Sequence, residues 1–110
     1  MLRDTLNKID SIIDNSQSLA ERPREELKAL TRDLRDELTA LEQEKADSAN
    51  SIAGFTKVAA HEALREDKNP ELAELSSHGL ERAVEEFEVS HPKLYETIKS
   101  ICVRLTGLGV

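Results

Sequence analysis

The chain has few of the residues that shape or stabilise non-helical proteins. Its 110 residues include a single cysteine, Cys102, no tryptophan and only three aromatic residues. A lone cysteine excludes a disulfide within the chain and favours a reducing compartment. Four glycines and three prolines are too few for a fold rich in tight turns. The core must therefore be built mainly from leucine, isoleucine, valine and alanine, which typically fill the seams between helices.

Long apolar runs are also absent. The N-terminal segment MLRDTLNKID carries a charge every few residues and lacks the apolar stretch of about 7–15 residues that a secretory signal needs. No stretch approaches the ~20 apolar residues of a membrane-spanning helix. We therefore expect a cytoplasmic protein without a membrane partner.

An overall basic charge is missing as well. The net charge of −7 disfavours nucleic-acid binding by the chain as a whole, because phosphates attract a basic face. Residues 89–110 are mildly basic, with Lys93, Lys99 and Arg104 against Glu96. Cations near helix C-termini are usually solvated surface charges. This segment supports only an alternative function, that of a small regulator binding a ligand or nucleic acid through its C-terminal helix.

What the sequence does contain is helical periodicity. Apolar residues recur at alternating steps of three and four, the spacing of one face of an α-helix. The pattern predicts an all-α protein without strands. We predict a single domain, residues 1–110, made of helical hairpins in an elongated bundle with one long central helix. The expected helices span residues 2–20, 23–66, 70–89 and 92–106.

The central segment is open to two interpretations. From Leu34 to Glu62 the seam positions step by four and three without a slip, which favours one continuous helix over residues 23–66. At 1.5 Å per residue such a helix would be about 66 Å long. The alternative is a break at residues 47–50, where aspartate, serine and asparagine are all competent N-caps.

The sequence Ser90-His91-Pro92 is the strongest candidate for chemistry, yet a junction between two helices explains it better. The residue before a proline is disfavoured in a helix, and proline is favoured at the first helical position. The Ser90 side chain is suited to capping. A catalytic role for His91 needs a partner residue, and no motif in the sequence provides one.

Other candidates for catalysis or metal binding are weaker. His61 and Glu62 begin like the helix of a zinc protease, but Arg65 takes the place of the second histidine. His78 lacks the glutamate three residues earlier that a di-iron bundle requires. Cys102 lies on or beside the apolar stripe of the last helix and is expected in the core. We therefore expect no enzymatic activity, no cofactor and no metal.

The C-terminal part of the chain resembles a known family. The segment SSHGLERAVEEFEVSHP, followed by an amphipathic helix and GLGV, is similar to the short bacterial proteins called domain of unknown function 4404. The resemblance is good over residues 70–110 and loose over residues 1–45, whereas residues 46–69 depart from the shorter members. It implies an all-α bacterial protein and brings no activity, ligand or catalytic residue.

The expected function follows from the long central helix. The rest of the chain is too short to cover such a helix, so Ile52, Phe55 and Ala59 would stay exposed in a monomer. Contiguous exposed apolar residues usually mark an interface. We therefore expect a homodimer, most simply an antiparallel pairing of the long helices in a coiled-coil seam. The expected role is a non-catalytic interaction or scaffold module.

Overall fold

The computed structural model describes residues 1–109 and contains only helices and their connections within that range. The predicted all-α class is confirmed. The elements, in chain order, are α1 (Leu2–Asn15), α2 (Glu21–Glu42), α3 (Ala46–Leu64), α4 (Pro70–Val84), the 3₁₀ helix η1 (Glu85–Phe87) and α5 (Pro92–Gly109). No helix in the described part of the chain is both long and apolar enough to cross a membrane.

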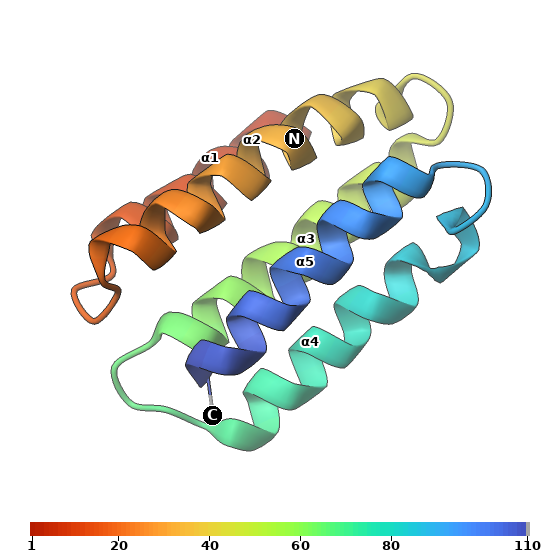
Figure 1. Cartoon of the computed structure of the whole chain (residues 1–110). Helices are drawn as coiled ribbons and strands as arrows, with labels where there is room; N and C mark the ends of the chain where they lie inside the picture. Colours follow the sequence, from red (N-terminus) through yellow and green to blue (C-terminus); the bar gives the residue numbers. More distant parts are fainter. Residues whose placement is uncertain (110) are drawn as a thin grey trace.

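The five α-helices lie side by side in a bundle (Figure 1). The hairpin of α1 and α2 lies on one side, α4 lies on the other, and α3 and α5 lie between them. α3 packs against all four other α-helices. The longest dimension of the Cα trace is 37 Å and its radius of gyration is 12.8 Å, close to the ~13 Å of a compact domain of about 100 residues.

The prediction of one helix over residues 23–66 is wrong. α2 ends at Glu42 and α3 begins at Ala46, so the chain reverses direction at residues 43–45, just before the alternative break at 47–50. The three turn residues, Gln-Glu-Lys, favour helix by intrinsic propensity. Burial overrides this preference, because folding α3 back places its alanine-rich surface in the shared core.

The buried face of α3 is also wider than the predicted seam. Ile52, Ala59 and Glu62 lie on that seam and are buried, whereas Phe55 lies on it and is exposed. Ala49 and Thr56 lie beside the seam and are buried as well. Alanine occupies most of the buried positions of α3. Such small side chains let four neighbouring helices approach α3 closely.

Helix ends elsewhere also differ from the prediction. α1 stops at Asn15 instead of residue 20, because Ser16 adopts an extended backbone conformation. The helix expected to reach residue 89 ends at Val84 and continues as η1. α5 extends to Gly109, beyond the predicted end at residue 106, because Leu105 and Leu108 still pack on the core.

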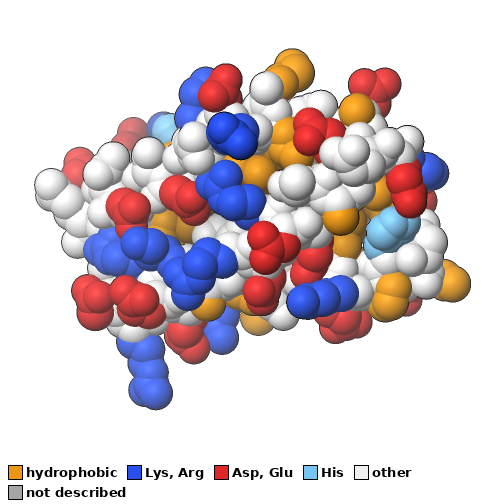
Figure 2. Space-filling view, turned by 90° about the horizontal axis from the view of Figure 1, so that it is seen from above, with side chains coloured by type: hydrophobic (Ala, Val, Ile, Leu, Met, Phe, Trp, Pro, Cys, Tyr) orange, Lys and Arg blue, Asp and Glu red, His pale blue; other side chains and the backbone are white. Residues whose placement is uncertain are grey.

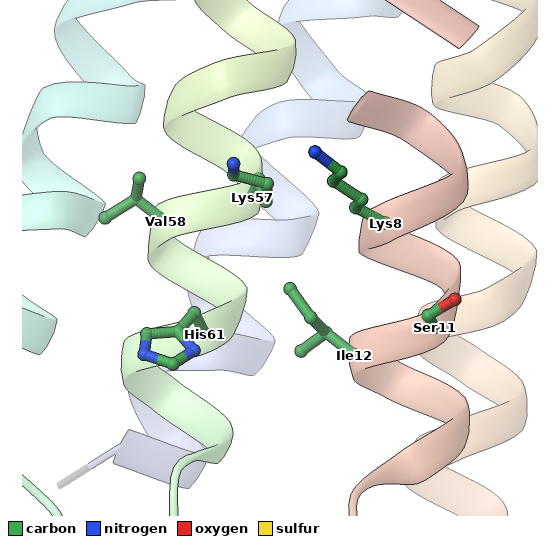
Figure 3. Close-up of a pocket in the computed structure, with 6 residues that line it drawn as sticks. All are labelled: Lys8, Ser11, Ile12, Lys57, Val58 and His61. Carbon is green, nitrogen blue, oxygen red and sulfur yellow. The ribbon is translucent and has the colours of Figure 1, made fainter. Parts of the chain in front are cut away.

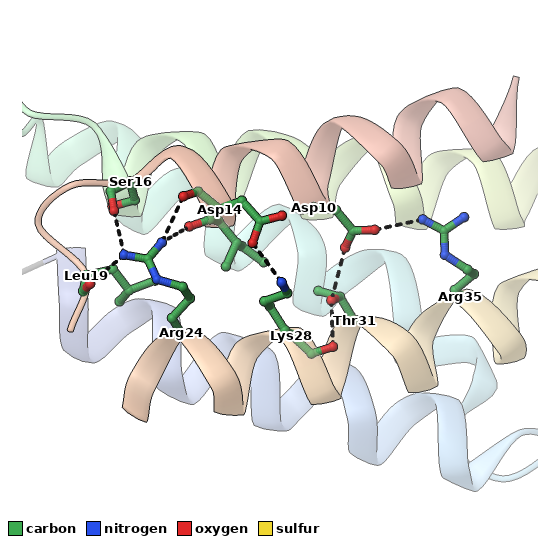
Figure 4. A network of polar contacts seen from close by, with 9 residues as sticks. Asp10, Asp14, Ser16, Leu19, Arg24, Lys28, Thr31 and Arg35 are labelled. Atoms are coloured by element: carbon green, nitrogen blue, oxygen red, sulfur yellow. Dashed lines mark hydrogen bonds and ion pairs between the residues drawn. The ribbon is translucent and has the colours of Figure 1, made fainter. Parts of the chain in front are cut away.

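The open end of α1 is closed by Arg24 (Figure 4). Its guanidinium donates hydrogen bonds to the backbone carbonyls of Ile13 (2.5 Å), Asp14 (3.1 Å), Ser16 (2.8 Å) and Leu19 (2.7 Å). Carbonyls at a helix C-terminus have no partner within the helix. One side chain from α2 therefore caps α1 and fixes the loop between the two helices.

Polar contacts continue along the hairpin of α1 and α2. Asp10 pairs with Arg35 at 2.9 Å and accepts a hydrogen bond from Thr31 at 3.3 Å, and Asp14 pairs with Lys28 at 2.9 Å. Figure 4 shows these contacts in a row beside Arg24. Exposed ion pairs contribute little to stability, so this row chiefly sets the register of the two helices.

Candidate functional site

The three residues proposed for a dimer interface do not lie together on the surface. Ile52 and Ala59 are 0% and 2% exposed, so the prediction that they form an interface between chains is wrong. Both contact helices of their own chain because α3 folds back into the bundle. Phe55, 44% exposed, remains accessible.

Phe55 belongs to an exposed apolar surface, which we call the α3–α4 face. Its members are Phe55, Val58, Leu72 and Leu75, which are 44%, 44%, 42% and 66% exposed. They surround a shallow hollow of about 210 Å³. The Phe55 ring rests on Gly79, where an added Cβ would lie 2.8 Å from the ring. The glycine thus lets α3 and α4 meet closely, and the four side chains form one patch.

The apolar pattern of α4 contains a signal for this face. The buried stripe of α4 consists of Ser76, Leu80 and Val84. Leu72 and Leu75 lie to one side of that stripe and are exposed. A single buried stripe does not account for Leu72 and Leu75. These two extra apolar residues are the sequence signal for the α3–α4 face.

A second hollow lies on the other side of α3, and we call it the α1–α3 groove (Figure 3). Its volume is about 480 Å³. Figure 3 shows Ile12 extending from α1 toward α3, with Lys8 and Lys57 over the gap between the two helices. The residues that line the groove are Lys8, Ser11, Ile12, Lys57, Val58 and His61. Val58 borders both the groove and the α3–α4 face.

Ser90, His91 and Pro92 lie between η1 and α5, and Pro92 is the first residue of α5. The His91 N–H donates to the Phe87 carbonyl (2.9 Å), and the His91 carbonyl accepts from the Tyr95 N–H (3.1 Å). The Ser90 hydroxyl lies 2.9 Å from His91 Nδ1. Ser90 therefore orients the imidazole rather than capping α5 as expected from the sequence.

The His91 imidazole has the neighbours of a structural residue. Its ring meets the Phe87 ring edge-on, with centroids 5.4 Å apart. Its Nε2 lies 4.0 Å from a carboxylate oxygen of Glu44. Ser90, His91 and Glu44 follow the order of a catalytic triad, but 4.0 Å is too long for the hydrogen bond that would orient the base. The geometry is that of a junction that ties the turn between α2 and α3 to the start of α5.

This junction lies in the segment that relates the chain to other proteins. Residues 58–110 match the family model described as "Domain of unknown function (DUF4404)". The match confirms the resemblance over the end of α3 and all of α4, η1 and α5. It includes residues 58–69, although residues 46–69 are expected from the sequence to depart from the shorter members, and it does not extend to residues 1–57. No curated protein and no solved structure matches the chain.

The description of DUF4404 names no activity. The matched segment contains three members of the α3–α4 face, Val58, Leu72 and Leu75, while Phe55 lies just outside it. The exposed apolar surface is therefore largely a feature of the DUF4404 segment.

The other two histidines lie on the surface, and the cysteine lies in the core. His61 and His78 are exposed, and Arg65 pairs with the buried Glu62 at 2.9 Å. Across the described residues, no three His, Cys, Asp or Glu side chains are grouped closely enough to hold a metal ion. Cys102 is buried, and burial raises the pKa of its thiol. A thiol with a raised pKa is a poor nucleophile at neutral pH.

The cations of the basic C-terminal helix are matched by carboxylates. Their pairs are Lys93 with Glu37 (4.0 Å), Lys99 with Glu81 (3.0 Å) and Arg104 with Glu26 (3.0 Å). Figure 2 likewise shows basic and acidic side chains interspersed over one face of the molecule. α5 therefore offers little free positive charge for a nucleic acid, which weighs against the alternative function.

Glu37, between α2 and α5, is an acid whose buried carboxylate lacks a full set of hydrogen-bond partners. Its side chain is 12% exposed, and Oε1 is buried without a hydrogen-bond partner in the described part of the chain. Oε2 accepts a hydrogen bond from Thr97 (3.2 Å). Burial raises the pKa of the carboxyl group, although Thr97 and Lys93 oppose the shift.

Replacing Glu37 with glutamine should stabilise the protein at pH 7 by on the order of 1 kcal/mol, since it removes a buried charge that lacks a full set of partners. The pKa of Glu37 is raised in the folded state, so its contribution to stability falls as pH rises through that pKa. The gain from the substitution should therefore shrink toward pH 4. Urea unfolding of both proteins at the two pH values measures this, and an equal difference at both would contradict it.

Proposed function

We propose that this protein is a non-catalytic helical module that self-associates, with a second copy covering the α3–α4 face. The observation that carries the proposal is the contiguous exposure of Phe55, Val58, Leu72 and Leu75. Most other exposed residues in the described part of the chain are charged or polar. A patch of large apolar side chains within a charged surface usually marks an interface.

The dimensions of the bundle are compatible with a modest dimer. The chain exposes 6535 Å² of accessible surface, and the ~800 Å² that each partner buries in an interface of standard size is about one eighth of it. We expect a dissociation constant in the micromolar range, because only part of an interface of that size would be apolar.

The test is substitution of Leu75 by glutamate. Leu75 is the most exposed member of the face, and its change leaves the Phe55–Gly79 contact between α3 and α4 untouched. A charge at the centre of an apolar contact should weaken association at least about tenfold, which corresponds to 1.4 kcal/mol. Sedimentation velocity over a concentration series measures the dissociation constant of each protein.

Val103 provides the matched control. It is 71% exposed on α5 and lies outside the α3–α4 face, so Val103→Glu makes a similar chemical change and should leave association intact. Circular dichroism checks that both variants remain folded. A wild type that stays monomeric at high micromolar concentration would contradict the proposal. Equal weakening by both variants would show that the dimer uses another surface.

A further inference from the structure

The α1–α3 groove combines an apolar floor with a cationic end. Its volume of about 480 Å³ lies within the ~300–1,000 Å³ of small-molecule sites, which are mostly apolar and carry a few placed polar groups. Ile12 and Val58 supply the aliphatic lining, and the described residues that line the groove include two lysines but no aspartate or glutamate. In a chain with a net charge of −7, such a hollow favours an anion over a cation.

The two lysines, Lys8 and Lys57, lie at one end of the groove. Figure 3 shows one ammonium group from α1 and one from α3 at this end, which is the end nearer the N-termini of both helices. Ile12 follows Lys8 by four residues, so the apolar floor begins one helical turn further along. Two ammonium groups at one end of a hollow repel each other unless an anion lies between them.

The fold itself makes no use of these two charges. Within the described part of the chain, neither Lys8 nor Lys57 has an ion pair or a side-chain hydrogen bond, although Lys57 is half-buried. The other lysines described there all contact an oxygen acceptor, in the pairs Lys28 with Asp14, Lys45 with Glu86, Lys93 with Glu37, Lys99 with Glu81, and Lys68 with the carbonyl of Ala63. The two exceptions border the same groove. This coincidence favours an external anion as their partner.

We propose that the α1–α3 groove binds an aliphatic carboxylate, such as a medium-chain fatty acid. The carboxylate lies between Lys8 and Lys57, where its two oxygens accept a hydrogen bond from each ammonium group. The hydrocarbon chain lies along Ile12 and Val58, which removes apolar surface from water. All the groups that form this site belong to one copy of the chain, so binding does not depend on self-association.

The extent of the apolar floor limits the chain length of the ligand. Past Ile12 the next hollow along the two helices is largely polar. On the side of α1 and the loop that follows it, this hollow is lined by Asn15, Ser16, Gln17 and Ser18. A hydrocarbon chain of about six to eight carbons therefore covers the one to two helical turns of the floor, whereas a longer chain gains little.

Titration of the ¹⁵N-labelled protein with octanoate tests this site, with amide chemical shifts as the readout. We expect saturable shifts centred on residues 8–12 and 57–61, with a dissociation constant of about 1 mM for so small a ligand. Octan-1-ol keeps the chain without the charge, and acetate keeps the charge without the chain, so each should bind at least about tenfold more weakly. Either one binding as tightly as octanoate would overturn the proposal, and so would octanoate shifts centred on the α3–α4 face.

Removing the charges gives a second test. Lys8→Gln and Lys57→Gln should each weaken octanoate binding about threefold to fivefold, and the double variant at least about tenfold. Lys93→Gln is the matched control, because it makes the same change at an exposed lysine on α5, outside the groove, and it should bind like wild type. Circular dichroism verifies folding, and if a groove variant does not fold, the comparison of octanoate with octan-1-ol still decides. Equal affinity of the double variant and wild type would overturn the proposal.

Discussion

Replacing Phe87 with alanine should lower the free energy of unfolding by about 3–5 kcal/mol, the usual cost of removing a buried aromatic side chain. Phe87 is 1% exposed and the largest fully buried side chain in the described part of the chain. Its ring contacts His91 edge-on and lies 5.5 Å from the Lys45 ammonium group. The substitution therefore opens a cavity. It also removes the ring that contacts both Lys45, in the turn between α2 and α3, and His91, in the junction before α5.

Urea unfolding followed by circular dichroism measures this effect, and Phe55→Ala is its matched control. The same atoms are removed at Phe55, but this side chain is 44% exposed. We expect the control to cost about 1 kcal/mol, because less apolar surface returns to water. A loss at Phe87 no greater than that at Phe55 would contradict the burial of Phe87.

Replacing Arg24 with alanine should destabilise the protein by about 2–4 kcal/mol. The substitution removes four hydrogen bonds from one guanidinium to the carbonyls at the end of α1 and in the following loop. Hydrogen bonds from a charged donor are stronger than neutral ones. The part-buried carbonyls would also lose their partner, which adds a desolvation cost.

Two further variants show whether the planar guanidinium causes the effect. Arg24→Lys keeps the charge but cannot reach four carbonyls with a planar fork of donors, so it should recover less than half of the lost stability. Arg32, exposed on the same helix, is the matched control, and Arg32→Ala should change stability by less than about 0.5 kcal/mol. Equal unfolding midpoints for Arg24→Ala and Arg32→Ala would contradict the capping role of Arg24.

Much of the fold could be predicted from local patterns. The four-three spacing of Leu2, Leu6, Ile9 and Ile13 coincides with the buried face of α1. The pattern works there because a helix on the outside of a bundle buries only one stripe. The same reasoning fails for α3, which packs against four helices and buries a much wider surface.

The candidate site could be predicted only in part. The sequence predicts that Phe55, Ile52 and Ala59 are exposed, and in the structure Phe55 is exposed whereas Ile52 and Ala59 are buried. All three depended on a helix too long to be covered by its own chain. Once α3 folds back, burial depends on which neighbour covers each side of it. Homodimer formation itself stays a prediction.

Long-range polar contacts were beyond the reach of sequence patterns. Arg24 caps a helix that ends nine residues earlier, and Glu37 meets Thr97 sixty residues along the chain. Nothing in the local sequence distinguishes Arg24 from Arg32, or Glu37 from the exposed Asp36. Such contacts are specified by which helices become neighbours.

The sequence by itself determined the helical class, because apolar spacing and the scarcity of glycine, proline and aromatic residues act locally. Only the tertiary structure decided where α2 ends and which side of α3 is buried. Residues 43–45 favour helix locally, yet they form a turn. The reason is energetic: a small helix propensity is lost at three residues, while folding back buries the alanine-rich surface of α3 among four helices.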